Sequence, residues 1–139
     1  MILITDDLRA RLLANGAVAT GTNHVPVVKL FNPVGAATWL LTELDADGDT
    51  LFGLCDLGFG FPELGSVSLA ELQSVKGPLG LGIERDHHFA PRYPLSVYAE
   101  AARIAGHITE AERLLQHAAA TLALSQFELP PDAADDKRR

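Results

Sequence analysis

Residues 37–58, "ATWLLTELDADGDTLFGLCDLG", contain two apolar stretches separated by a short polar one. The apolar stretches, residues 37–44 and 50–58, are rich in leucine, threonine and aromatic residues, which is typical of β-strands. The five residues between them, "DADGD", have glycine in the second-last position, as hairpin loops often do. The pattern predicts an antiparallel hairpin at the centre of the fold.

The same loop invites comparison with a calcium-binding loop between two helices. Asp45, Asp47 and Asp49 have the spacing of its first three ligands, and Asp56 falls at its last ligand position. However, Thr50 stands where that loop needs glycine, and the flanking residues are typical of strands. We favour a polar turn whose aspartates accept local backbone hydrogen bonds. A weak cation site at the hairpin tip stays open as the alternative.

The residues before the hairpin predict a helix and a strand. In "TDDLRARLLANG", residues 5–16, leucines recur at helical spacing, Thr5 can act as N-cap, and two aspartates fall in the first turn. The segment "VPVVKLF", residues 25–31, predicts a strand. Pro26 near its start indicates an edge position, because proline cannot donate to a neighbouring strand.

The residues after the hairpin predict a short strand, a helix and another strand. The stretch "SVSL", residues 66–69, is expected to run as a strand into a short helix. Ser68 and Glu71 have the spacing of a capping box, and a Gly-Pro pair then ends that helix. Residues 83–89 predict a further strand.

Two helices are predicted near the carboxyl end. One covers residues 95–106, and the second begins at Thr109, whose capping-box partner would be Glu112. A new cap within the helical region argues for a helical hairpin. The predicted fold is therefore α+β, with a small antiparallel sheet. Its expected parts are an α+β core of residues 1–93, a C-terminal helical hairpin of residues 94–127 and a disordered tail of residues 128–139.

The composition is that of an ordinary globular protein, and the length of 139 residues predicts one domain. The single cysteine, Cys55, excludes an internal disulfide and a zinc site built from several cysteines. The formal net charge of −7 argues against direct binding to nucleic acid. No apolar run approaches the roughly 18 residues that cross a bilayer. Since no signal peptide is apparent either, we expect a cytoplasmic protein without membrane contact.

The segment "ERDHHF" holds the densest group of chemically active side chains. In a strand, Glu84, Asp86 and His88 would point to one face, and Arg85 and His87 to the other. Two carboxylates and an imidazole on one face would suit a metal site or general acid–base catalysis. The interpretation that we favour is a solvent-facing strand in which Arg85 pairs with a neighbouring carboxylate.

Phe59 and Phe61 lie in a loop rich in glycine and proline. In one interpretation these two side chains cover the core. In the other they form an exposed contact loop for a partner protein. Arg85 and His87 are further candidates for binding a partner. The glycine-rich "GPLGLG" lacks the lysine and the preceding strand of a phosphate-binding loop. It is interpreted as a helix stop, so no motif indicates a cofactor. Cys55 is interpreted as a structural thiol.

Three stretches, "LITDDLRARLLANG", "ATWLLTELDADGDTLFGLCDLGFG" and "ELGSVSLAELQSVKGPLGLGIERDHHF", resemble the domain-of-unknown-function 2958 family of small bacterial proteins. Residues 65–89 are the most specific part, although Gly82 stands where the family commonly has proline. The resemblance implies no established activity. It implies a small cytoplasmic accessory protein of a bacterial mobile element, and it suggests that the helices after Pro94 are an extension.

Two functional hypotheses follow. The first is a non-enzymatic accessory factor that binds another protein, with a homo-oligomer through the C-terminal helices as an open possibility. The second is a metal-dependent hydrolase or nuclease that uses Glu84, Asp86 and His88. The enzyme hypothesis requires these three side chains to converge in one hollow.

Overall fold

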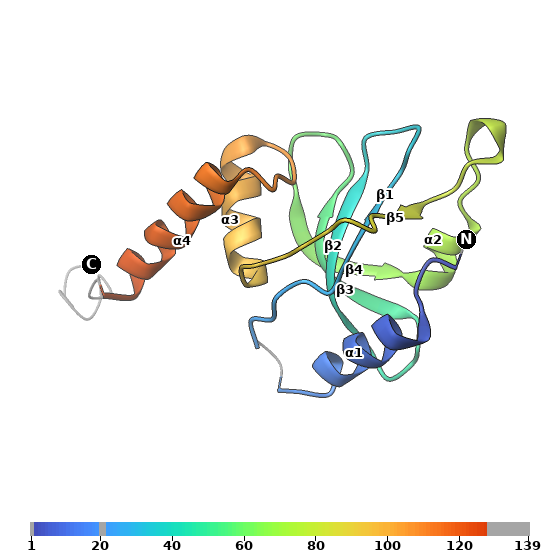
Figure 1. Ribbon diagram of the computed structural model, residues 1–139, viewed down its shortest axis with the longest axis horizontal. Helices are drawn as coiled ribbons and strands as arrows, with labels where there is room; N and C mark the ends of the chain where they lie inside the picture. Colours follow the sequence, from blue (N-terminus) through green and yellow to red (C-terminus); the bar gives the residue numbers. More distant parts are fainter. Residues whose placement is uncertain (1, 20–21, 128–139) are drawn as a thin grey trace, which may run out of the picture.

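The computed structural model describes residues 2–19 and 22–127 (Figure 1). The predicted tail of residues 128–139 lies outside this part. The elements in chain order are α1 (Asp6–Gly16), β1 (Val28–Phe31), β2 (Thr38–Leu44), β3 (Thr50–Asp56), β4 (Glu63–Ser68), α2 (Leu69–Ser74), the 3-10 helix η1 (Pro78–Gly80), β5 (Glu84–Arg85), α3 (Leu95–Ala105) and α4 (Glu112–Phe127).

The strands form one five-stranded sheet in the order β4-β3-β2-β1-β5 (Figure 1). Every neighbouring pair is antiparallel. The first four strands form a meander, and β5 returns to lie beside β1. The predicted hairpin joins β2 and β3 at the centre of the sheet, which confirms the predicted α+β class with an antiparallel sheet.

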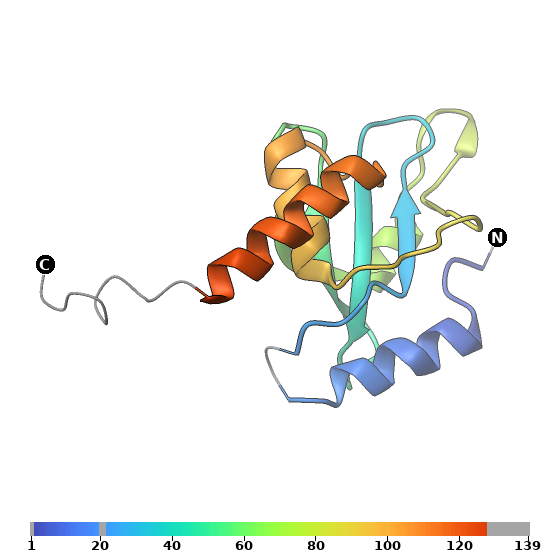
Figure 2. The same cartoon turned by 60° about the vertical axis from the view of Figure 1, so that its left-hand side comes forward.

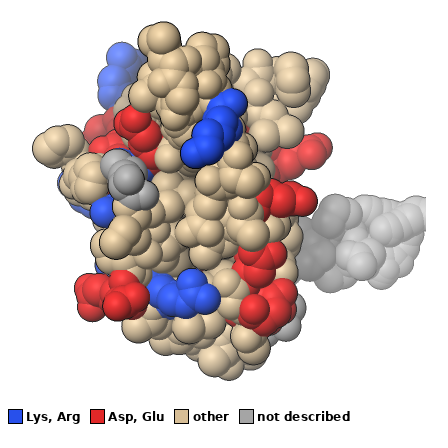
Figure 3. Space-filling view, turned by 90° about the vertical axis from the view of Figure 1, so that its right-hand side faces the viewer, with Lys and Arg blue, Asp and Glu red and all other residues tan. Residues whose placement is uncertain are grey.

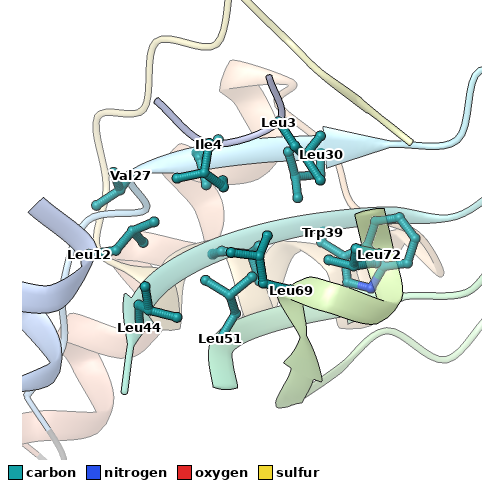
Figure 4. Close-up of a cluster of buried hydrophobic side chains, with 12 residues drawn as sticks. Leu3, Ile4, Leu12, Val27, Leu30, Trp39, Leu44, Leu51, Leu69 and Leu72 are labelled. Carbon is teal, nitrogen blue, oxygen red and sulfur yellow. The ribbon is translucent and has the colours of Figure 1, made fainter. Parts of the chain in front are cut away.

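One face of the sheet is covered by α1, α2 and the residues before α1. Figure 4 shows Leu69 of α2 beside Leu51 and Leu72 of α2 beside Trp39, with Leu12 of α1 near Leu44. Burial of this apolar surface is the main stabilising contribution on this side, at roughly 25 cal/mol for each Å² removed from water.

The opposite face is covered by α3 and α4 (Figure 1). Leu40 and Leu54 of the sheet pack against Tyr98 of α3, and Leu115 of α4 joins the same buried cluster. Because both faces are covered, β2 is buried along nearly its whole length. The last part of α4 reaches beyond the body of the described chain (Figure 2), and Leu124 there is exposed.

A bulge in β2 joins the sheet to α1. The pairing of β2 with β3 shifts between Leu41 and Glu43, so Thr42 is an extra residue in the ladder. The Thr42 carbonyl accepts a hydrogen bond of 2.9 Å from the Asn15 side chain. The Asn15 side chain near the end of α1 therefore provides a hydrogen-bond donor for the Thr42 carbonyl at the bulge.

Two polar side chains, the exposed Asn23 and the buried Asp56, hold α3 in place. Asn23 Oδ1 accepts from the Ser96 backbone N–H at 3.1 Å, and Asn23 Nδ2 donates to Ser96 Oγ at 2.7 Å. At the other end of the helix, the buried Asp56 carboxylate accepts from the backbone N–H groups of Gly58 and Ile108, at 2.8 and 2.9 Å. Asn23 thus caps the start of α3, and Asp56 fixes the connection from α3 to α4.

Two of the predicted N-caps, Thr5 and Ser68, are confirmed, although among the described residues the Glu71 carboxylate does not accept the return bond of a capping box from the Ser68 N–H. Thr5 Oγ1 accepts from the Leu8 N–H at 3.2 Å, and Ser68 Oγ accepts from the Glu71 N–H at the same distance. Both are the side-chain bonds expected at a helix N-cap.

The third predicted cap is wrong. α4 begins at Glu112, and Thr109 Oγ1 accepts from Ala111 before the helix starts. The Glu112 carboxylate accepts from the Tyr93 hydroxyl at 2.6 Å. The Glu112 carboxylate therefore bonds to the side chain of Tyr93 and not to the backbone N–H of Thr109, as a capping box would require.

Two strand predictions also need correction. The strand expected over residues 83–89 is limited to Glu84–Arg85, because Asp86 Oδ1 accepts from the His88 N–H at 2.8 Å and the chain turns there. Pro26 does not mark an edge: it lies before β1, which is flanked by β2 and β5. The division at residue 93 stays a prediction, although α3 packs directly against the sheet.

Candidate interaction surface

Four large apolar side chains are exposed where β3 turns into β4. Their exposed fractions are 57% for Leu57, 79% for Phe59, 80% for Phe61 and 52% for Leu64. We call these four side chains, together with the outer edge of β4, the β4 edge surface. Exposed apolar patches of this kind mark contact sites more often than isolated surface residues do.

The loop that displays the two phenylalanines is shaped by glycine. Gly58 and Gly60 have φ angles of +92° and +90°, a conformation that other residues rarely adopt. A Cβ atom at Gly58 would also lie 2.6 Å from the Cβ of Ala36. These turns direct the chain so that Phe59 and Phe61 face solvent and do not cover the core, while their role as a contact loop stays a prediction.

The outer edge of β4 presents backbone groups as well. The Leu69 N–H donates to the Asp49 carbonyl at 2.8 Å, so Leu69 and Asp49 are a hydrogen-bonded pair in line with the antiparallel register of β4 and β3. Along β4, residues whose backbone groups point toward β3 alternate with residues whose backbone groups point away from it. By this alternation, the N–H and C=O groups of Leu64 and Ser66 point away from β3. Within the described residues, no strand pairs with this edge.

Two hollows adjoin β4. One of about 500 Å³ is lined by residues 63–66 of β4 and by Leu57, Phe59, Phe61 and Cys55. The other, of about 700 Å³, lies between the sheet and the start of α3, and Phe52, Leu64 and Leu95 line its apolar part. Burial raises the pKa of the Cys55 thiol, which keeps this sulfur protonated and fits a structural role.

The aspartates of the central hairpin serve the turn and a helix. Asp47 Oδ1 accepts from the backbone N–H groups of Asp49 and Thr50, both at 2.8 Å. The hydroxyl of Thr50 donates to Asp47 Oδ2 at 2.6 Å, and this bond is the main reason why the pKa of Asp47 is lowered. Asp45 Oδ1 accepts from the next backbone N–H. These local bonds are those expected of a polar turn.

Asp49 reaches from the hairpin to α2. Its Oδ1 accepts from the Ala70 N–H at 2.8 Å, and its Oδ2 accepts from the Ser68 hydroxyl at 2.7 Å. The hairpin tip is therefore attached to the first turn of a helix. No group of three or more His, Cys, Asp or Glu residues that could hold a metal ion occurs among the residues described.

Replacing Asp49 with alanine is expected to lower the free energy of unfolding by about 1–2 kcal/mol, because an N–H at the start of α2 loses its acceptor. Asp45→Ala is the matched control in the same loop, and its exposed side chain should change stability by less than about 0.5 kcal/mol. Urea unfolding of both variants measures the difference. A rise in melting temperature with Ca²⁺ that both variants abolish would instead indicate the cation site.

Glu84, Asp86 and His88 do not share a strand face, because β5 ends at Arg85. Glu84 lines a hollow beside α2, whereas Asp86 lines a different hollow beside β1. Asp86 forms an ion pair with Lys29 at 3.6 Å. His88 is exposed. The structure therefore does not bring the three predicted side chains into one hollow.

The other side chains of this segment have different partners from those expected. Arg85 pairs with no carboxylate of residues 2–19 or 22–127: its Nη1 donates to the carbonyls of Ile2 and Leu3, at 2.9 and 2.6 Å. Arg85 thus attaches the amino-terminal segment to the sheet edge. His87 is exposed.

Basic side chains are scattered over the face of the molecule drawn in Figure 3. On the face shown in Figure 3, Lys and Arg are separated by Asp, Glu and uncharged residues and form no continuous patch. A continuous basic surface is the usual feature of proteins that bind nucleic acid through its phosphates.

A family model described as "Protein of unknown function (DUF2958)" matches residues 3–109. The chain belongs to this family. No curated protein and no solved structure matches. The match to DUF2958 includes the whole β4 edge surface and continues through α3, beyond the predicted boundary at residue 93.

Sequence reasoning about this DUF2958 protein found only part of the β4 edge surface. The pattern indicates Phe59 and Phe61 but not Leu57 and Leu64. It predicts a strand over residues 50–58, which includes Leu57, and it predicts the next strand from residue 66, whereas β4 begins at Glu63. Leu64 lies between Glu63 and Gly65, and no local pattern there indicates that its side chain is exposed. In addition, none of the DUF2958 helices in the described part is long and apolar enough to cross a membrane.

Proposed function

We propose that the protein is a non-enzymatic interaction protein whose β4 edge surface binds another protein. The observation that supports this proposal is the exposure of four large apolar side chains between residues 57 and 64, beside a strand edge that no described strand covers. Apolar anchors are the side chains that most often dominate protein–protein binding energy. Water contact with them is unfavourable until a partner covers them.

The enzyme hypothesis has less support. Asp86 is paired with Lys29, and Glu84 lines another hollow, so the convergence that acid–base or metal chemistry needs is missing from this segment. We therefore place the function in binding.

The family resemblance supports a cellular setting for the proposal. It suggests an accessory protein of a bacterial mobile element, acting in the cytoplasm on a protein of the host or of the element. Homo-oligomerisation through α3 and α4 stays a prediction, for which the exposed Leu124 on α4 is the relevant apolar contact.

The double variant Phe59→Ser/Phe61→Ser is expected to lose its partner. Both side chains are about four-fifths exposed, so the fold should tolerate the change while binding falls at least about tenfold. Each version of the protein is immobilised, exposed to an extract of the native bacterium, and the retained proteins are quantified by mass spectrometry.

Leu79→Ser is the matched control, because Leu79 is 94% exposed and lies in η1, outside the β4 edge surface. It should retain the same partner as the unaltered protein. Circular dichroism confirms that all versions are folded. If the double variant and the control retain the same proteins in the same amounts, the proposal is wrong.

A further inference from the structure

The outer edge of β4 lacks the usual protection against pairing with another strand. Residues 63–68, "ELGSVS", contain no lysine and no proline. The pairing of β4 with β3 is continuous from Glu63 to Ser68, without a bulge that would twist the edge away. Proteins commonly use such features to prevent an edge strand from accepting a further strand. Their absence from β4 makes its edge available.

The hollow beside β4 has the course of a strand. It is lined by four consecutive residues, 63–66, which alternate between the two faces of the sheet. The hollow therefore extends along four residues of β4, close to its outer edge. Phe59 and Phe61 line the same hollow and offer contacts to apolar side chains. The shape therefore suits an extended chain that lies beside β4.

The charges around β4 are all of one sign. The charged residues that line the hollows beside β3 and β4 are Glu43, Asp45 and Glu63, and no Lys, Arg or His of the described chain lines them. Glu43 is half-buried and takes part in none of the salt bridges between described residues. A second copy of this acidic chain would add negative charge here, whereas a basic segment would complement it.

We propose that the β4 edge binds an extended, basic and apolar segment of a partner protein as an added strand. The backbone of the segment pairs with the outward N–H and C=O groups of Leu64 and Ser66. Its apolar side chains contact Phe59 and Phe61, and its Lys or Arg side chains face the acidic groups. This inference rests on the proposed function and specifies how the partner is recognised.

The experiment selects short random peptides displayed on phage against the immobilised full chain. The peptides recovered are expected to alternate apolar residues with Lys or Arg, since an added strand presents alternate side chains to each face. Their affinity is then measured for Ser66→Pro and for the matched control Ser66→Ala. Both changes remove the hydroxyl, but only proline removes the outward N–H.

Ser66→Ala should bind these peptides as the unaltered protein does, and Ser66→Pro should bind at least about tenfold more weakly. Hydrogen exchange of the unaltered protein provides a second measurement that needs no variant. The bound peptide should slow the exchange of the backbone amides of Leu64 and Ser66.

Three results would overturn the inference. They are recovery of no peptide or of peptides without basic residues, equal binding to both Ser66 variants without slowed exchange, and a dimer of the chain that Ser66→Pro dissociates. The outcome is distinct from that of the proposed function. If Phe59→Ser/Phe61→Ser loses the host partner while Ser66→Pro keeps it, the surface binds a protein but not by an added strand.

Discussion

Replacing Gly53 with alanine should unfold the protein or lower its free energy of unfolding by more than about 3 kcal/mol, beyond the usual cost of overpacking. Gly53 lies at the centre of β3, opposite Leu41. A Cβ atom there would be 2.0 Å from the Leu40 carbonyl oxygen and 2.8 Å from the Leu41 Cα. Because these are backbone atoms of the central strand, no side-chain rotation can relieve the contact.

Gly65→Ala is the matched control for this prediction. Gly65 is paired directly with Gly53 in the next strand, but a Cβ atom there would meet nothing within 4 Å. This change should alter stability by less than about 0.5 kcal/mol. Urea unfolding followed by circular dichroism measures both variants. Equal losses would show that strand glycines matter here for a reason other than the contact with β2.

Replacing Asp56 with alanine is the second change with a large expected effect, a loss of about 2–4 kcal/mol. The side chain is only 4% exposed, and its two oxygens accept from the backbone N–H groups of Gly58 and Ile108. Without the carboxylate, the Ile108 N–H in the connection between α3 and α4 loses its acceptor. Asp56 falls at the last ligand position of a calcium loop, an interpretation that the flanking residues argued against, and in the structure it is a structural carboxylate.

Asp56→Asn separates the two contributions of this side chain. Its amide oxygen can still accept one bond, so the loss should be about half of that in Asp56→Ala. Chemical denaturation gives the stability, and hydrogen exchange at the Ile108 amide reports the local effect. If the alanine variant is as stable as the unaltered protein and protects Ile108 equally, the assignment of Asp56 is wrong.

The elements that depend on local sequence were predictable. The central hairpin and the caps at Thr5 and Ser68 involve residues within a few positions of one another. The predictions that were wrong depend on a partner far away in the sequence or on a local turn that competes with the predicted strand. Glu112 bonds to Tyr93 instead of capping α4, and the turn at Asp86 ends β5 after two residues.

The β4 edge surface was predictable only in part, because some of its features depend on strand pairing between residues far apart in the sequence. Glycine and proline around Phe59 and Phe61 indicated an exposed loop from local sequence alone. That β4 is an edge strand depends on β5 pairing with β1 instead, a choice that no local pattern in residues 63–68 contains. The role of Leu64 follows from that choice.

The attachment of Asn23 to the start of α3 has a consequence for the order of folding. The cap joins Ser96 to a residue 73 positions earlier, and it therefore closes a long loop, whereas the β2–β3 hairpin closes a short one. The hairpin can form early, but α3 gains its cap only after the chain around β1 has taken its place. We therefore expect α3, together with α4 that packs against it, to dock last and to open first when the native protein fluctuates.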